Sequence, residues 1–198
     1  TSGGEDEEPT ENPNASKPRY IWIDAAANFP DFANSKENIA RDLALAKDAG
    51  FTDIVVDVRP TTGDVLFKTN LVDQVKFMYA WIGSNYTKVE RTATWDYLQA
   101  FVDEARKQGL RIHAAINTFV GGNQIDGGTG LLYRDQSKAE WATQMNMQVG
   151  ITSVMNTSES TKFFNPAHPE VQTFLCDLLK DLAGYDLDGI FLDRGRFL

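Results

Sequence analysis

The sequence has little of several residue types, and each shortage excludes a class of protein. One cysteine among 198 residues allows neither an internal disulfide nor a multi-cysteine zinc site. Two histidines leave little material for a histidine-based metal site, and no cofactor is expected. The formal net charge of −9 argues against a nucleic-acid partner, which requires a basic surface. No apolar run approaches the roughly 20 residues of a membrane-spanning helix.

The remaining composition is that of a folded protein with a distinct start. Hydrophobic residues make up 42% of the chain, which is enough to bury the core of one domain. Residues 1–18 instead combine acidic residues and prolines with no large apolar side chain. Such a segment cannot offset its ordering entropy, so we expect a disordered acidic linker over 1–18 and a folded part over 19–198. The linker resembles the stalk of a bacterial surface lipoprotein, and an ordinary frayed terminus is the alternative.

Beyond the linker, short apolar runs alternate with amphipathic segments. The pattern predicts strands at 20–24, 54–59, 110–117 and 189–193, and helices at 35–49, 94–108 and 169–183. Ser35, Thr94 and Pro169 mark the helix starts, and a glycine follows each helix. Strands that alternate with helices imply right-handed βαβ units and a parallel sheet, hence an α/β fold.

The turn after the first predicted strand decides between two parallel-sheet architectures. An open nucleotide-binding sheet usually has a glycine-rich phosphate turn there, but residues 25–30 contain no glycine. The glycine pairs at 121–122 and 127–128 are not followed directly by a helix, so they make a poor phosphate cradle. A (β/α)8 barrel is therefore favoured, and this chain would supply roughly its first four βα units.

Side-chain alternation divides each predicted strand into an apolar face and a mixed face. We expect the apolar faces to lie beneath the helices and the mixed faces to point into the barrel. Each mixed set ends in a polar residue at the carboxyl end of its strand: Asp24, Arg59, Asn117 and Asp193. Barrel enzymes build their active sites at that end, so these are candidate site residues, with strand-end caps or salt bridges as the alternative role. His113 lies mid-strand and is expected to be a hydrogen-bonded interior residue.

Two segments on the same side are much longer than ordinary βα connections. Residues 60–93 and 118–168 carry many aromatic side chains, among them Phe67, Phe77, Tyr79, Trp81, Tyr86, Phe119, Tyr133 and Trp141. Exposed rings beside carboxylates and amides suit sugars, whose C–H faces stack and whose hydroxyls form hydrogen bonds. A small separate core within each loop is the alternative role. Loops of this length indicate function or embellishment.

Several spaced segments form a recognisable set. They are VDVRPTTGDVLF at 56–67, GLRIHAAIN at 109–117, Glu140-Trp141, NPAHPEV at 165–171 and YDLDGIFLD at 185–193. In this order and spacing they resemble the motifs of the glycosyl-hydrolase-like family 10 barrels, which are of bacterial secreted or lipoprotein type. The resemblance runs from Tyr20 to Phe197, with Ala115 and Thr118 standing where the family has Trp and Pro.

The resemblance implies a (β/α)8 barrel that hydrolyses glycosidic bonds of a bacterial or environmental polysaccharide or cell-wall glycan. The site residues that it implies are Arg59, Asp64, Asn117 and Asp193. Asp193 is the candidate catalytic carboxylate, held ionised by a nearby arginine. The candidate substrate-binding residues are Asp24, Arg59, Asp64, Asn117, Arg194, Arg196 and Trp141. Asp24 or Asp64 could also supply the second carboxyl that glycoside hydrolysis requires.

Two other functions stay open. One is a catalytically inactive glycan-binding barrel protein of a surface uptake system, and the other is a metal-dependent hydrolase that uses Asp24, Asp57 and Asp193. We expect an extracytoplasmic protein, in the periplasm or on the cell surface, with a lipid anchor outside this sequence as a membrane tether. A barrel of this type needs about 250 residues and eight strands. We therefore expect the chain to be the N-terminal portion of a longer protein, with the second carboxyl beyond Leu198.

Overall fold

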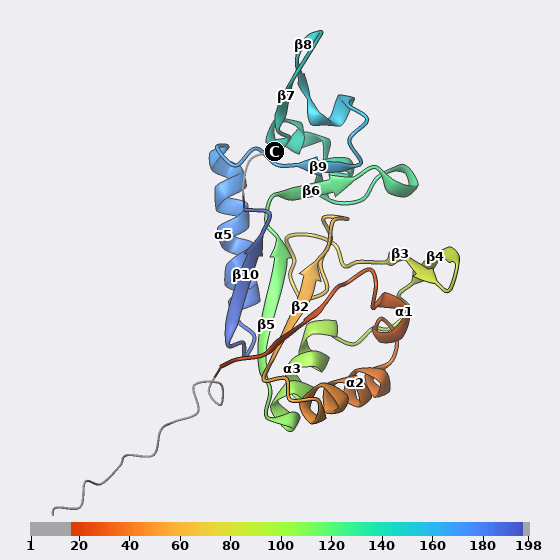
Figure 1. The fold of residues 1–198 in the computed structure, drawn as a ribbon. Helices are drawn as coiled ribbons and strands as arrows, with labels where there is room; N and C mark the ends of the chain where they lie inside the picture. Colours follow the sequence, from red (N-terminus) through yellow and green to blue (C-terminus); the bar gives the residue numbers. More distant parts are fainter. Residues whose placement is uncertain (1–16, 196–198) are drawn as a thin grey trace, which may run out of the picture.

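The centre of the fold is a parallel sheet of four strands in the order β1-β2-β5-β10 (Figure 1). The structure of the chain is a computed structural model, and it describes residues 17–195. Almost all of the predicted linker and the candidate residue Arg196 lie outside the described residues. The strands are β1 (Tyr20–Ile23), β2 (Asp53–Arg59), β5 (Arg111–Asn117) and β10 (Gly189–Asp193). All neighbouring pairs are parallel, as the sequence predicts.

Three long helices connect these strands, and their ends follow ordinary capping rules. They are α2 (Lys36–Asp48), α3 (Tyr97–Gln108) and α5 (Pro169–Ala183). The side chain of Ser35 accepts the N–H of Asn38 at the start of α2, as expected from its position. The predicted cap at Thr94 was wrong, because the carboxylate of Asp96 accepts the N–H of Gln99 and starts α3 later.

The predicted apolar face of the sheet packs against the helices. Its core members are Ile23, Ile54, Val56, Val58, Ile112 and Ile116, which join buried side chains of α2, α3 and α5 in one hydrophobic cluster. Leu192 departs from the pattern and is 53% exposed, because β10 lies at an edge of the described sheet. Burial of this face supplies the main driving force for the layered arrangement.

The two long connections fold into elements of their own. The first contains an antiparallel hairpin of β3 (Phe77–Ile82) and β4 (Asn85–Glu90). The second contains β6 (Val120–Asn123), α4 (Leu131–Arg134), β7 (Gln144–Met147), β8 (Gly150–Ser153) and β9 (Thr161–Phe163), with β6 paired to β9 and β7 to β8. A short helix, α1 (Phe29–Phe32), follows β1. These additions lie toward the carboxyl ends of the central strands (Figure 1).

A buried carboxylate joins β2 to β5 at the opposite end of the sheet. Asp53 is 1% exposed, accepts two hydrogen bonds of 3.0 and 2.9 Å from the Arg111 guanidinium, and lies 2.7 Å from Nε2 of His113. Burial raises the pKa of Asp53, but the bonds from Arg111, Thr52 and His113 outweigh it and leave the pKa below its ordinary value. His113 is thus the hydrogen-bonded interior residue that the sequence predicts.

Replacing this carboxylate should cost stability in a pH-dependent way. We expect Asp53→Asn to lower the free energy of unfolding by about 2 kcal/mol at neutral pH, since a charged acceptor is lost from a buried cluster. A carboxyl whose folded-state pKa is depressed stabilises the fold above its unfolded pKa of about 4 and loses that contribution as the pH falls further. Urea denaturation should therefore show that the difference in the free energy of unfolding between wild type and Asp53→Asn becomes smaller below about pH 4. A gap that stays constant with pH would contradict the role of the charge.

Candidate functional site

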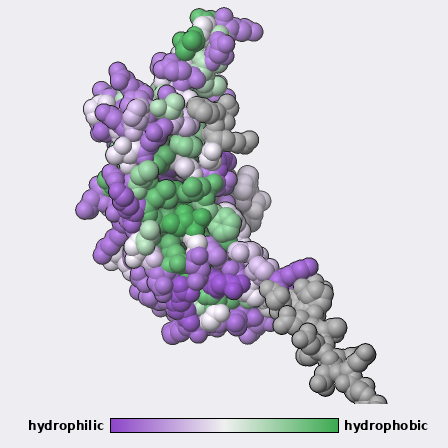
Figure 2. Space-filling view, turned by 90° about the vertical axis from the view of Figure 1, so that its left-hand side faces the viewer, coloured by the Kyte–Doolittle hydropathy of each residue, from purple (hydrophilic) through white to green (hydrophobic). Residues whose placement is uncertain are grey.

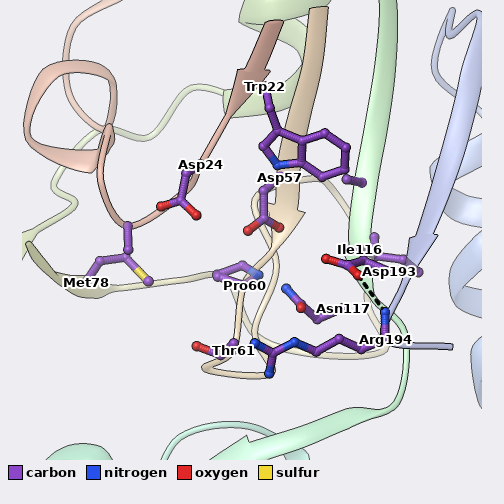
Figure 3. A pocket seen from close by; sticks show the side chains of 12 residues that line it. Trp22, Asp24, Asp57, Pro60, Thr61, Met78, Ile116, Asn117, Asp193 and Arg194 are labelled. Carbon is purple, nitrogen blue, oxygen red and sulfur yellow. Dashed lines mark hydrogen bonds between the residues drawn. The ribbon is translucent and has the colours of Figure 1, made fainter. Parts of the chain in front are cut away.

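A pocket lies where the carboxyl ends of β1, β2, β5 and β10 meet (Figure 3). Its polar lining includes Asp24, Asp57, Asn117, Asp193 and Arg194. Asp24 follows β1, while the others come from or directly follow the ends of β2, β5 and β10. In-register parallel pairing brings these positions together, since Asp193 pairs with Asn117 and Asp57 with Ala115. Of the predicted site residues, the pocket contains Asp24, Asn117, Asp193 and Arg194.

Arg59 is placed differently from its neighbours in the predicted set. Its side chain is fully buried and does not line the pocket. Its guanidinium donates to the backbone oxygens of Asn117, at 2.6 Å, of Thr118, at 3.2 Å, and of Val120. A register shift between Asp57 and Arg59 sets Arg59 opposite Ile116 and out of line with Asp57. Burial lowers the pKa of Arg59 to about 10, which leaves the guanidinium charged at neutral pH.

Further hydrogen bonds join the strand ends around Arg59. The side-chain amide of Asn117 donates to the backbone oxygen of Arg59 at 2.9 Å. Both the backbone N–H and the hydroxyl of Thr118 donate to the backbone oxygen of Asp193, at 2.9 and 2.8 Å. The carboxyl ends of β2, β5 and β10 are therefore bound to one another through polar contacts as well as through the sheet. This arrangement fixes the directions from which Asp57, Asn117 and Asp193 enter the pocket.

Two other predicted residues lie away from this pocket. Asp64 accepts hydrogen bonds from the guanidinium of Arg134, which also pairs with Asp73 at 3.0 Å. Trp141 is buried, donates from Nε1 to Glu170 at 2.9 Å and packs against the ring of Phe174. Trp141 thus joins the main hydrophobic cluster, where it packs against α5, and does not form a separate core within the long second connection.

Asp57 is the pocket residue that the predicted site set lacks, since it entered only the metal-dependent alternative. Its position on the mixed face, two residues before the end of β2, was the available signal. Burial, with a smaller contribution from the negative charges of Asp24 and Asp193, raises the pKa of Asp57 to about 7 against the bond from the Arg59 N–H. Figure 3 shows the Asp24 and Asp57 carboxyls near each other, with Asp193 on the far side of Asp57. Asp57 therefore holds a proton over most of the range below neutral pH.

Asp193 accepts the backbone N–H of Arg194 at 2.8 Å, the contact dashed in Figure 3. Within residues 17–195 the Asp193 carboxylate forms no ion pair. The guanidinium of Arg59 donates to backbone oxygens instead, and Arg194 donates to Asp193 through its backbone N–H. Arg194 has a φ of 48°, a left-handed conformation that residues other than glycine rarely adopt. Such strain is concentrated at functional sites, which agrees with a special role for this turn.

Neither a metal cluster nor a membrane span is found in the part of the chain that the structure describes. No group of three or more His, Cys, Asp and Glu side chains there is arranged to hold a metal ion, so the metal-dependent alternative finds no support. None of the described helices combines the length and the apolar content needed to cross a bilayer.

Comparison with protein families identifies one that spans nearly the whole chain. The model described as glycosyl hydrolase-like 10 matches residues 17–196. Among curated proteins, an S-layer-related protein from Niallia circulans is 30% identical over 183 residues, which is 89% of this chain and 11% of that protein. The chain thus spans about a ninth of the length of this relative.

Solved structures with a similar fold include barrel glycoside hydrolases. A hypothetical protein from Ruminiclostridium thermocellum has a TM-score of 0.56 at 14% identity, over 91% of this chain and 77% of that one. An α-L-fucosidase from Paenibacillus thiaminolyticus gives 0.56 at 18% identity, over 88% and 23%. The α-galactosidase TtGalA from Thermus thermophilus gives 0.51 at 12%, over 88% and 30%. The chain therefore has an α/β fold that corresponds to part of a (β/α)8 barrel.

The raised pKa of Asp57 has a measurable consequence for stability. The folded state holds a proton that the unfolded chain releases near pH 4, so the contribution of Asp57 to the free energy of unfolding should fall by roughly 1 kcal/mol per pH unit between about pH 4 and 7. Asp57→Asn should lack this slope, because the amide does not titrate, and should be more stable than wild type at pH 8. Urea denaturation across this range measures both, with the exposed Asp48→Asn as the matched control. Parallel profiles for wild type and Asp57→Asn would refute the assignment.

Proposed function

The chain belongs to the glycosyl hydrolase-like 10 family, and from this premise we propose that its strand-end pocket hydrolyses glycosidic bonds of a polysaccharide or cell-wall glycan. The observation that carries the proposal is the meeting of three carboxyls, Asp24, Asp57 and Asp193, in one pocket, where burial raises the pKa of Asp57 to about 7. Glycoside hydrolysis uses one protonated and one ionised carboxyl group on either side of the scissile bond. Neighbouring carboxyls whose environments push their pKa values apart are the usual sign of such a division of roles.

In this proposal Asp57 is the general acid and Asp193 is the ionised carboxylate. As the bond to the leaving group breaks, the proton of Asp57 passes to the glycosidic oxygen. Asp193 either attacks the anomeric carbon, forming a glycosyl-enzyme ester that water then cleaves with Asp57 as the base, or removes a proton from the water that attacks the anomeric carbon directly. Asp24 raises the pKa of Asp57 by its charge and offers an acceptor for a sugar hydroxyl. Asn117 and Arg194 offer hydrogen-bond donors, and Trp22 offers a ring face in the pocket wall.

We also propose that β1, β2, β5 and β10 are the first four strands of the barrel, with Asp193 at the end of the fourth. The strands lie in chain order, and their helices pack on one face. The opposite face carries Tyr20, Trp22 and Phe191, whose rings contact one another at 5.6 to 6.2 Å although all three are partly exposed. In a closed barrel this face is filled by packed side chains. Figure 2 shows apolar side chains gathered in the middle of the side that carries β10 and α5.

A location outside the cytoplasm is part of the proposal. The relative from Niallia circulans is described as S-layer-related. The acidic, proline-containing sequence at 1–18 suits a tether between a surface and a folded domain. A lipid anchor would complete such a tether, and a glycan substrate would be encountered there.

A second candidate function is glycan binding without hydrolysis. It is favoured by one feature of Asp193: within the described residues its carboxylate accepts only the Arg194 N–H and forms no ion pair. Turnover separates the two candidates, because binding without any product from a range of glycans would support the second one.

Removal of either carboxyl should reduce turnover, but in different ways. We expect Asp193→Asn to reduce hydrolysis of every substrate by about 100- to 10,000-fold, and Asp57→Asn to do so for natural glycans. With dinitrophenyl glycosides, whose leaving group needs no proton, Asp57→Asn should retain most of the wild-type rate of dinitrophenolate release in the first turnover. Reducing-sugar and chromogenic assays on the purified protein measure these rates, with Asp48→Asn as the control. Full turnover of natural glycans by Asp57→Asn would remove that residue from the mechanism.

A further inference from the structure

The β3–β4 hairpin has an inner face and an outer face of different character. Met78 and Ala80 point inward and are buried. On the outer face, pairing sets Trp81 directly opposite Tyr86 and Tyr79 opposite Lys88. Trp81 is 68% exposed and Tyr86 is 57% exposed. The two largest side chains of the hairpin tip thus remain in solvent while smaller apolar ones are buried.

The outer rings form a continuous surface. Tyr79 stacks on Tyr86 with ring centroids 5.3 Å apart and an angle of 26° between planes. Trp81 lies 5.2 Å from Tyr86. We call Tyr79, Tyr86 and Trp81 the aromatic platform. These rings contact one another along the outer face of the hairpin, where Trp81 and Tyr86 are exposed and Tyr79 is partly buried.

Polar contacts at its base hold the platform in place. The hydroxyl of Tyr79 donates to the carboxylate of Asp126 at 3.0 Å, and Lys88 pairs with the same carboxylate at 2.9 Å. The Lys88 ammonium also lies 4.4 Å from the ring centroid of Phe77. The hairpin is thereby attached to the second long connection. The charges at the base neutralise each other, so the platform presents ring faces and hydroxyl groups and no unpaired lysine or aspartate.

The same hairpin contributes a wall of the pocket. Met78, on its inner face, lines the pocket together with Asp24, Asp57 and Asp193. The label in Figure 3 places Met78 on the side of the pocket next to Asp24. Tyr79 follows Met78 directly, so the platform begins one residue from the pocket lining and extends away from it toward the hairpin tip.

We propose that the aromatic platform binds a neutral stretch of polysaccharide outside the pocket and holds the glycan chain whose bond the pocket receives. This inference rests on the proposed function for its choice of ligand. Ring faces suit the C–H faces of sugars, and the paired charges at the base leave nothing to attract an ionic ligand. An obligate protein interface would require a far larger apolar area than three rings on a two-stranded hairpin.

The test uses the full chain and defined glycans. Affinity gel electrophoresis with hydroxyethylcellulose, xylan or soluble starch, and pull-down on insoluble peptidoglycan, measure binding. We expect Trp81→Ala and Tyr86→Ala each to weaken binding about 2- to 12-fold, the range that corresponds to the loss of one aromatic contact. Ile82→Ala is the matched control, because Ile82 is an exposed apolar residue of the same hairpin on its other face, and it should bind as wild type does.

Chemical protection separates the platform from the pocket. Bound glycan should shield Trp81 from N-bromosuccinimide oxidation, read by peptide mass spectrometry, with Trp95 as the internal reference. Shielding of Trp22 without Trp81 would overturn the platform and leave the pocket proposal intact. Shielding of Trp81 with no turnover of any glycan would support the platform and reject the hydrolase. Failure of the wild-type chain to bind any of the probes would overturn the platform. The same holds if light scattering shows that Trp81→Ala and Tyr86→Ala change self-association of the chain and leave glycan binding unchanged.

Discussion

The buried guanidinium of Arg59 is the interaction on which the pocket depends. It binds the backbone oxygens of three residues that follow or end β5, and Asn117 returns a bond to the backbone of Arg59. Thr118 then binds the end of β10 through two donors to Asp193. A charge in the core is costly unless it is hydrogen-bonded, and here Nη1 and Nη2 of Arg59 donate to these oxygens while Nε has no partner among the described residues. The folded chain therefore has one arrangement of these strand ends, and this arrangement determines the positions of the pocket carboxyls.

That arrangement gives the two ends of β2 opposite electrostatic behaviour. At the amino end, Asp53 meets Arg111 and His113, which favour its ionised form. Toward the carboxyl end, Asp57 is buried beside Asp24 and Asp193, which favour its protonated form. The first site stabilises the fold at neutral pH, whereas the second reduces stability there. A fold keeps such an unfavourable group where it serves a function, and a proton donor in glycoside hydrolysis is a function of this kind.

Much of this was predictable from the sequence, because it follows from local periodicity. Alternation along the strands placed Asp24, Asn117 and Asp193 at one edge, and parallel pairing brings them into one pocket. Arg59 could not be placed in this way, since a period-two pattern does not reveal a register shift within β2. Asp57 has the right parity, but its importance comes from burial beside two other carboxyls, which only the folded chain shows. Whether a loop aromatic is exposed depends likewise on tertiary packing.

The central claim is that Asp57 holds its proton up to about neutral pH because it is buried beside two other carboxylates. Carbon-13 NMR titration of the Asp57 carboxyl group measures this directly, in wild type and in Asp193→Asn. The account predicts a pKa of about 7 in the wild-type protein and a lower pKa in the variant, where one neighbouring charge is gone. A pKa near 4 in both proteins, the ordinary value for an exposed aspartate, would contradict it.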